Sequence, residues 1–129
     1  MNRMAAPVVA FAALLVLPAC GTLSGVKPKP ADLLRDALAG GRLAAGLDKR
    51  ALAMAADAEY RALEKGVAGA PVDWKASETL FGSIVPQQAF SVGATNCRRY
   101  VHSISEQGAL RSATATACRD ADGLWRPIS

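Results

Sequence analysis

The stretch CRRYVHSISEQGALRSATATACR, residues 97–119, decides the fold. Two strand-like runs, 97–105 and 110–119, flank a short connection that contains glycine, and this pattern predicts a β-hairpin. A turn centred between Gln107 and Gly108 places Cys97 directly opposite Cys118 on the neighbouring strand. Directly opposite Cβ atoms are ~4.5–5.5 Å apart, close to the range that a disulfide bridges. The register therefore predicts a Cys97–Cys118 disulfide, which also suits an exported chain.

The same register divides the predicted hairpin into two faces. One face carries larger side chains over small ones, and its residues are Tyr100, His102, Ile104, Ala113, Ala115 and Ala117. The other face is more polar and carries Arg99, Val101, Ser103, Thr114 and Thr116. Because small residues allow close approach, we expect a helix to pack on the first face.

The clearest helix is predicted over residues 48–65. Asp48 is suited to cap its start, and Gly66 stands where a helix commonly ends. One side of this helix is rich in alanine and the other is charged, which is typical of a surface helix. Residues 31–45 predict a second, weak and short helix, because Gly40-Gly41 interrupts it.

The remaining segments predict short strands. Alternating residues indicate a strand over 72–76, and further strands are expected over 81–85, 90–92 and 124–128. Pro86 is expected to end the second of these, and the turn Asp120-Ala121-Asp122-Gly123 precedes the last. The sequence thus predicts an α+β fold, with one Ala-rich helix packed on an antiparallel sheet of four or five strands.

The first nineteen residues have the pattern of an export signal. Arg3 supplies a positive charge and residues 8–17 are wholly apolar, a run shorter than the ~20 residues of a spanning helix. Leu17-Pro18-Ala19-Cys20 is similar to a lipobox, the sequence after which a lipoprotein signal is cleaved. The alternatives are an ordinary secretory signal or an uncleaved anchor, but the A-x-A pattern of ordinary cleavage is missing. We therefore expect the Cys20 thiolate to receive a covalent lipid.

This interpretation divides the chain into three parts. Residues 1–19 are the predicted lipoprotein signal peptide, and residues 20–46 are the lipidated N-terminus, a flexible tether and the weak short helix. Residues 47–129 are the α+β domain. Gly21 is not the Asp that favours retention in the inner membrane, so we expect a lipid anchor in the outer membrane of a Gram-negative cell.

Several segments together resemble one family, the rickettsia-type 17 kDa surface antigens of the outer membrane. The resemblance extends from about residue 40 to 128, and its segments are Leu47-Asp48, AEYRALE at 58–64, PVDW at 71–74, Gly82 with Val85-Pro86, NCR at 96–98 with Tyr100 and His102, TACR at 116–119 and DGLW at 122–125. Similar proteins carry a long glycine-rich segment after the tether, of which only Gly40, Gly41 and Gly46 remain here. The resemblance implies an outer-membrane lipoprotein and brings no catalytic residues. With the glycine-rich segment reduced, membrane attachment is expected to depend on the Cys20 lipid.

No catalytic or metal-binding pattern accompanies these segments. His102 is the only histidine, and a lone histidine on a sheet is more often a packed residue than a base or ligand. We therefore predict a non-enzyme with no metal, no small-molecule substrate and no cofactor beyond the lipid on Cys20. The net charge of +4 is scattered, which argues against nucleic-acid binding. The candidate interaction or packing residues are Trp74, Tyr100, His102 and Trp125.

Two functional hypotheses follow. The first is a surface-antigen-type outer-membrane lipoprotein with a structural or envelope-interaction role. The alternative is a periplasm-facing protein-binding module that acts as an accessory or inhibitor of an envelope complex. The expected partners are the membrane, through the lipid, and an envelope protein.

Overall fold

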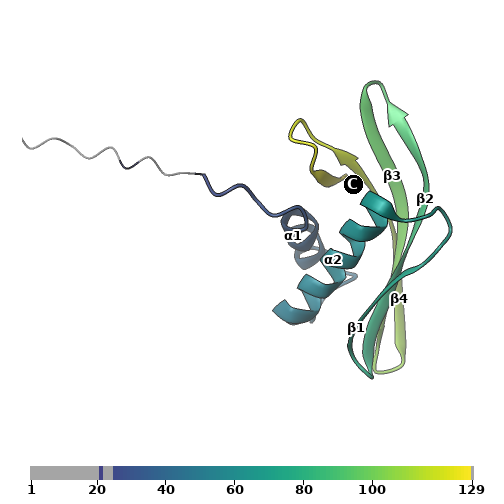
Figure 1. Ribbon diagram of the computed structural model, residues 1–129. Coiled ribbons are helices and arrows are strands. Elements are labelled where there is room, and N and C mark those ends of the chain that lie inside the picture. Colours follow the sequence, from purple (N-terminus) through teal and green to yellow (C-terminus); the bar gives the residue numbers. More distant parts are fainter. Residues whose placement is uncertain (1–20, 22–24, 129) are drawn as a thin grey trace, which may run out of the picture.

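The computed structural model describes residue 21 and residues 25–128 (Figure 1). The predicted signal peptide and Cys20 lie outside the described residues, so cleavage and lipidation stay predictions.

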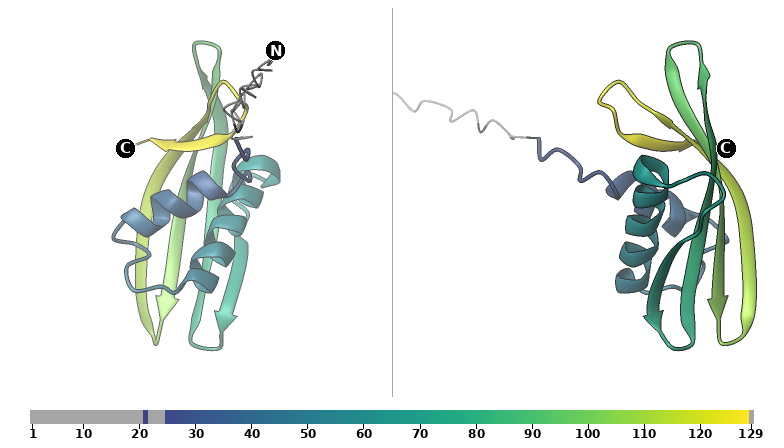
Figure 2. Two further views of the ribbon diagram at one scale, coloured as in Figure 1. Left: turned by 90° about the vertical axis from the view of Figure 1, so that its left-hand side faces the viewer. Right: turned by 45° about the vertical axis from the view of Figure 1, so that its right-hand side comes forward.

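Two helices lie on one face of a five-stranded antiparallel sheet (Figures 1 and 2). The strands follow their chain order across the sheet, from β1 at one edge to β5 at the other. The elements are α1 (Asp32–Gly40), α2 (Lys49–Lys65), β1 (Val72–Ser77), β2 (Leu80–Val92), β3 (Thr95–Glu106), β4 (Ala109–Arg119) and β5 (Trp125–Ile128). The predicted α+β class and antiparallel sheet are confirmed.

The prediction of a single packed helix is wrong, because α1 also contributes to the core. Leu34 and Leu38 point from α1 into the main hydrophobic cluster, and Ala44 joins it from the following loop. The interruption at Gly40-Gly41 is real, since Gly41 leaves the helix with extended backbone angles. The break therefore ends α1 but does not separate it from the domain.

Helix α2 begins as the sequence predicts. The Asp48 carboxylate accepts the backbone N–H of Ala51 at 2.8 Å, which caps the first turn. Its other end differs in one respect, because Gly66 has φ −65° and needs no left-handed backbone. Glycine is needed there for space instead, since a Cβ would lie 2.8 Å from the Pro86 ring.

Pro86 does not end a strand as predicted, and β2 runs on through it to Val92. The 81–85 and 90–92 segments are therefore parts of one strand, with an irregularity between Pro86 and Ala89. The Pro86 carbonyl accepts the N–H of Gly69, so Pro86 directs its backbone groups toward the β1 side. Strand β1 starts opposite Ile84, and the missing proline N–H thus removes no bond from the β1–β2 ladder.

The β3–β4 hairpin has the predicted register. Gln107 and Gly108 form a two-residue turn, both with positive φ (49° and 84°), as a tight hairpin of this twist requires. Tyr100 pairs with Ala115 and His102 with Ala113, so the predicted face forms and turns its larger side chains toward the helices.

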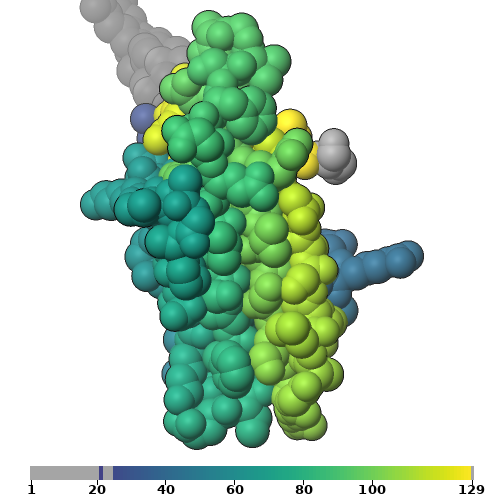
Figure 3. Space-filling view, turned by 90° about the vertical axis from the view of Figure 1, so that its right-hand side faces the viewer, coloured from purple at the N-terminus to yellow at the C-terminus, as the bar shows by residue number. Residues whose placement is uncertain are grey.

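The opposite face of the sheet is not covered by either helix (Figure 3). It exposes Phe81 and Leu110 beside serines of β2, β3 and β4. No helix in the described part of the chain is both long and apolar enough to cross a bilayer.

Candidate functional site

A buried polar cluster joins α2 to β1 and β3. The Trp74 indole N–H donates to His102 Nε2 at 3.0 Å, and His102 Nδ1 lies 2.8 Å from Glu59 Oε1. The exposed fractions of Glu59, His102 and Trp74 are only 2%, 1% and 4%. An indole N–H can only donate, so Nε2 must accept, and the imidazole proton must be on Nδ1. His102 therefore donates this proton to Glu59.

Burial dominates the acid–base properties of the cluster. Removal from water raises the pKa of the Glu59 carboxyl, and the hydrogen bond from His102 opposes this increase. The Tyr100 hydroxyl donates to the other Glu59 oxygen over a long 3.5 Å. Burial, followed by the nearby Glu59 charge, raises the Tyr100 pKa. Both groups are thus biased toward their protonated forms.

The sequence provides space for this cluster at Gly82. Gly82 lies opposite Trp74 in the β1–β2 ladder, and a Cβ there would be 2.7 Å from the indole nitrogen. The missing side chain lets the Trp74 ring lie across β2 and reach His102 on β3.

The cluster has part of the geometry of a catalytic pair but not its accessibility. A carboxylate that orients histidine through Nδ1 is the arrangement that hydrolases use to activate a nucleophile. Here the second nitrogen, Nε2, is bonded to the Trp74 indole rather than to a hydroxyl or thiol. Neither nitrogen has a free lone pair for a metal ion or substrate. The arrangement satisfies buried polar groups and fixes α2 on the sheet.

A second polar contact fixes the end of α2. Arg98 is 8% exposed, and its guanidinium donates to four backbone carbonyls at 2.6–3.2 Å: Ala62, Leu63, Gly66 and Gln87. Three of these carbonyls belong to the C-terminal turn and cap of α2. The Ala62 carbonyl also accepts the backbone N–H of Gly66, whereas the end of a helix leaves the later carbonyls without intrahelical donors. Arg98 thus connects the end of the helix with β2 and β3.

Trp125 lies apart from the other predicted aromatic residues. Its indole N–H donates to Glu64 at 2.9 Å, and Arg119 donates to the same carboxylate oxygen at 2.9 Å. The Arg119 guanidinium also lies 4.4 Å from the centre of the Trp125 ring. This group attaches the β4–β5 turn to α2.

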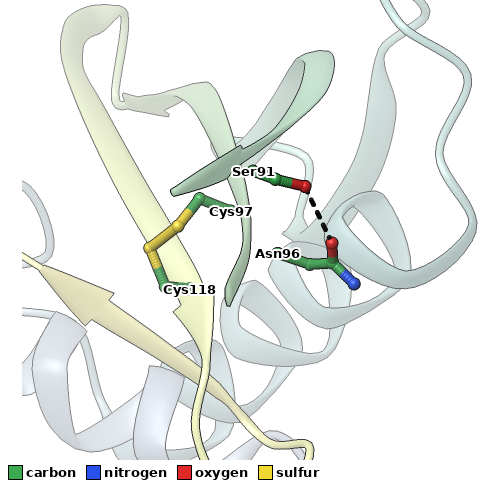
Figure 4. The surroundings of a disulfide bond; sticks show 4 residues. All are labelled: Ser91, Asn96, Cys97 and Cys118. Atoms are coloured by element: carbon green, nitrogen blue, oxygen red, sulfur yellow. Dashed lines mark hydrogen bonds between the residues drawn. A yellow bond between two sulfur atoms is a disulfide. The ribbon is translucent and has the colours of Figure 1, made fainter. Parts of the chain in front are cut away.

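The predicted disulfide is present and connects Cys97 on β3 with Cys118 on β4 (Figure 4). The two residues are direct partners in the ladder. At the neighbouring β2–β3 turn, the Ser91 hydroxyl donates to the Asn96 side-chain oxygen at 3.2 Å. The disulfide therefore joins the two strands at the end of the pairing that is remote from the Gln107-Gly108 turn.

Two of the hollows at the surface of the described region lie against the sheet. The larger, about 580 Å³, lies on the uncovered face beside Phe81, Ser103 and Leu110. The smaller, about 260 Å³, lies under the α1–α2 loop and is mostly apolar, with Leu38 and Leu43 on one side and Ala113 and Ala115 on the other. Glu59 and His102 form part of its lining, so it borders the buried cluster.

The structure brings together three of the four predicted aromatic and imidazole residues, namely Trp74, Tyr100 and His102. The sequence analysis missed Glu59, Arg98 and the partners of Trp125. Glu59 had a usable signal, because it lies one helical turn from both Ala55 and Ala62, within the apolar side of α2. An acidic residue in such a stripe requires a buried partner, and the lone histidine was available.

The chain is similar to curated proteins named 17 kDa surface antigen. It is 30% identical to the protein of Rickettsia bellii over 90 residues, which are 68% of this chain and 57% of the relative. The proteins of Rickettsia japonica and Rickettsia conorii are also 30% identical, over 88 and 87 residues, or 66% and 65% of this chain and 55% and 54% of the relatives. The resemblance to this family is confirmed, although the chain spans only about half the length of these relatives.

No protein-family model matches the chain. No solved structure is significantly similar to it.

Proposed function

We propose that the chain is a surface-antigen-type lipoprotein, held in the outer membrane by acyl chains on Cys20, with a structural or envelope-interaction role. The observation that supports this most is the similarity to the 17 kDa surface antigens. The name of these relatives places them at the cell surface, and the lipobox-like Leu17-Pro18-Ala19-Cys20 supplies a means of attachment.

The chemistry of the buried cluster supports a non-catalytic role. Catalysis by the His102–Glu59 pair would require a free Nε2 within reach of a substrate. That nitrogen instead accepts the Trp74 bond in a site that is 1% exposed.

Attachment is tested with a Cys20→Ala variant of the full chain. In cells given a labelled palmitate, the wild-type chain should carry label and sediment with outer membranes. The variant should carry no label and leave this fraction, whereas a Ser24→Ala control should behave as wild type. A variant that stays in the outer membrane, together with an unlabelled wild type, would overturn the proposal.

A second candidate function is a periplasm-facing module that binds an envelope protein. The uncovered sheet face favours it, because a surface with exposed Phe81 and Leu110 can accept a partner. Protease treatment of intact cells distinguishes the two orientations. Loss of the domain would support the surface-exposed role, and protection until the outer membrane is permeabilised would support the inward-facing module.

A further inference from the structure

Among the residues that the structure describes, the outer edge of β4 has no partner strand over most of its length. Strand β5 pairs only with Thr116–Arg119, while β4 begins at Ala109. Within the described residues, residues 109–115 make no backbone hydrogen bond beyond the sheet ladder. Their outward N–H and C=O groups are therefore available.

The turn geometry identifies which groups point outward. In a hairpin with a two-residue turn, the closing pair exchanges hydrogen bonds, which here is Glu106 with Ala109. Alternation along the strand then turns the backbone groups of Leu110, Ser112 and Thr114 away from β3. The same alternation turns the backbone groups of Ala117 toward β3, so the residue opposite Ala117 on β5 needs no N–H for pairing. That residue is Pro127, which has no backbone N–H. The position of this proline agrees with the assignment.

Strand β1 and the free part of β4 differ in how well they are protected from pairing with another strand. Edge strand β1 carries Asp73 and Lys75, and Arg50 from α2 donates to its Ala76 carbonyl. Charged side chains on an edge discourage pairing with another strand. By contrast, residues 112–115 of β4 read SATA, with neither charge nor proline.

The one charge nearby on β4 is already occupied. Arg111 donates to the Leu43 carbonyl at 2.9 Å and to Glu106 at 3.1 Å. The free part of the edge is therefore uncharged and accessible to another backbone.

The smaller hollow lies directly beside this edge. Ala113 and Ala115 line it, and the α1–α2 loop lies on the same side of the sheet (Figure 2). A strand added to β4 would direct alternate side chains to this face, next to Ala113. A volume of about 260 Å³ accommodates one large apolar side chain.

A positively charged side chain lies at the smaller hollow. Arg42 is part of its lining, is exposed, and makes no ion pair among the described residues. An acidic group on the incoming segment would complement it.

We propose that the β4 edge binds an extended peptide segment of a partner protein by strand addition, with an apolar side chain in the hollow and an acidic one near Arg42. In this mode the backbone bonds supply affinity and the side-chain pocket supplies selectivity. The inference goes beyond the lipid-anchored role and does not depend on it, since failure of Cys20 lipidation would leave the edge unchanged.

The test uses the full chain in detergent micelles and a library of random ten-residue peptides. Peptides selected by binding should alternate apolar and polar residues and include an acidic one. For such a peptide, amide hydrogen exchange should slow at Leu110, Ser112 and Thr114, and not at Asp73 or Lys75 on the other edge.

Two matched pairs of variants separate the backbone from the pocket. Thr114→Pro removes an outward N–H, whereas Thr114→Ala keeps it. Ala113→Leu fills the hollow from an exposed position, whereas Ser112→Leu adds the same side chain on the other face. Thr114→Pro and Ala113→Leu should each weaken binding at least about tenfold relative to their controls, with unchanged thermal unfolding.

Three outcomes would overturn the proposal. The first is the absence of any selected peptide that protects the three amides, and the second is equal affinity within each pair of variants. The third is protection of the amides in the chain alone together with a dimeric mass, which would assign the edge to a second copy of the chain.

Discussion

Glu59 shows how a single residue couples the core of this molecule to pH. Its carboxyl is almost fully buried and is contacted by His102 and Tyr100. Desolvation raises its pKa above the ordinary value of 4.5. Above pH 4.5 the unfolded chain loses this proton before the folded chain does, so the contribution to stability falls as pH rises toward the folded pKa.

We expect Glu59→Gln to gain stability relative to wild type as pH increases. Glutamine carries no charge, and its amide oxygen can still accept the His102 proton. In urea unfolding at about pH 4 and about pH 8, the free energy of unfolding of the variant relative to wild type should be higher at the alkaline value. Because the other groups are common to both proteins, parallel pH profiles would show that Glu59 ionises normally in the fold.

The sequence singled out most residues of the buried cluster but did not predict the hydrogen bonds between them. The hairpin register placed Tyr100 and His102 on one face, but nothing in the sequence brought Trp74 or Glu59 to them. Their meeting depends on Gly82, which lets the indole cross one strand, and on the placement of α2, which brings Glu59 above β3. Both are properties of tertiary packing that local periodicity does not contain.

At the scale of single elements, the ends of α2 depend on different interactions. Its start is capped locally by Asp48, three residues from the N–H that it binds, and this could be predicted from sequence. Its end is capped by Arg98, more than thirty residues away along the chain. No local pattern reveals such a partner, which explains why Gly66 alone was predicted to end the helix.

Arg98→Lys should destabilise the domain by about 2–3 kcal/mol. A lysine has a compact ammonium and cannot serve four carbonyls arranged around a planar guanidinium, so some of them lose their partner. The matched control is Arg99→Lys, which changes an exposed residue on the opposite face and should cost under about 0.5 kcal/mol. Equal losses in chemical denaturation would contradict the capping role.

Strand β2 illustrates a different limit of sequence-based prediction. Proline usually ends a strand, and this rule placed the end at Pro86. The rule assumes that the missing proline N–H costs the sheet a hydrogen bond. Here the backbone groups of Pro86 face the β1 side, and β1 begins to pair only at Ile84, so no ladder hydrogen bond is lost. Where the edge of a sheet lies is a tertiary property, so the proline alone could not settle it.

The disulfide between Cys97 and Cys118 was predictable because a hairpin register is a local property. It closes a loop with a sequence separation of 21 residues. Replacing both cysteines with alanine should lower the free energy of unfolding by about 3 kcal/mol, chiefly through greater freedom of the unfolded chain. The reduced wild-type protein should show a similar loss, and an unchanged denaturation midpoint after reduction would contradict this contribution.

At the scale of the whole molecule, the main revision concerns where the folded unit begins. The sequence assigned residues 20–46 to a tether with a weak helix. Helix α1 is indeed short, but Leu34 has no exposed surface and Leu38 has little. An isolated helix of nine residues is marginal in water, so its order must come from packing on α2 and β5. The folded domain thus begins at α1, nearer to Cys20 than residue 47, where the sequence placed its start. If Cys20 is lipidated, this shorter connection holds the domain closer to the membrane.

Leu34→Ala tests whether α1 belongs to the cooperative unit. If it does, losing this buried side chain should cost about 2–5 kcal/mol of global stability, in a single unfolding transition. Leu33→Ala, on the same helix but at a partly exposed position, should cost less. If α1 were an appendage of the tether, both variants would unfold at the wild-type denaturant concentration, and only local amide exchange in residues 32–40 would increase. The result also bears on the β4 edge, because α1 and its following loop form one side of the hollow, and a detached helix would leave no pocket there.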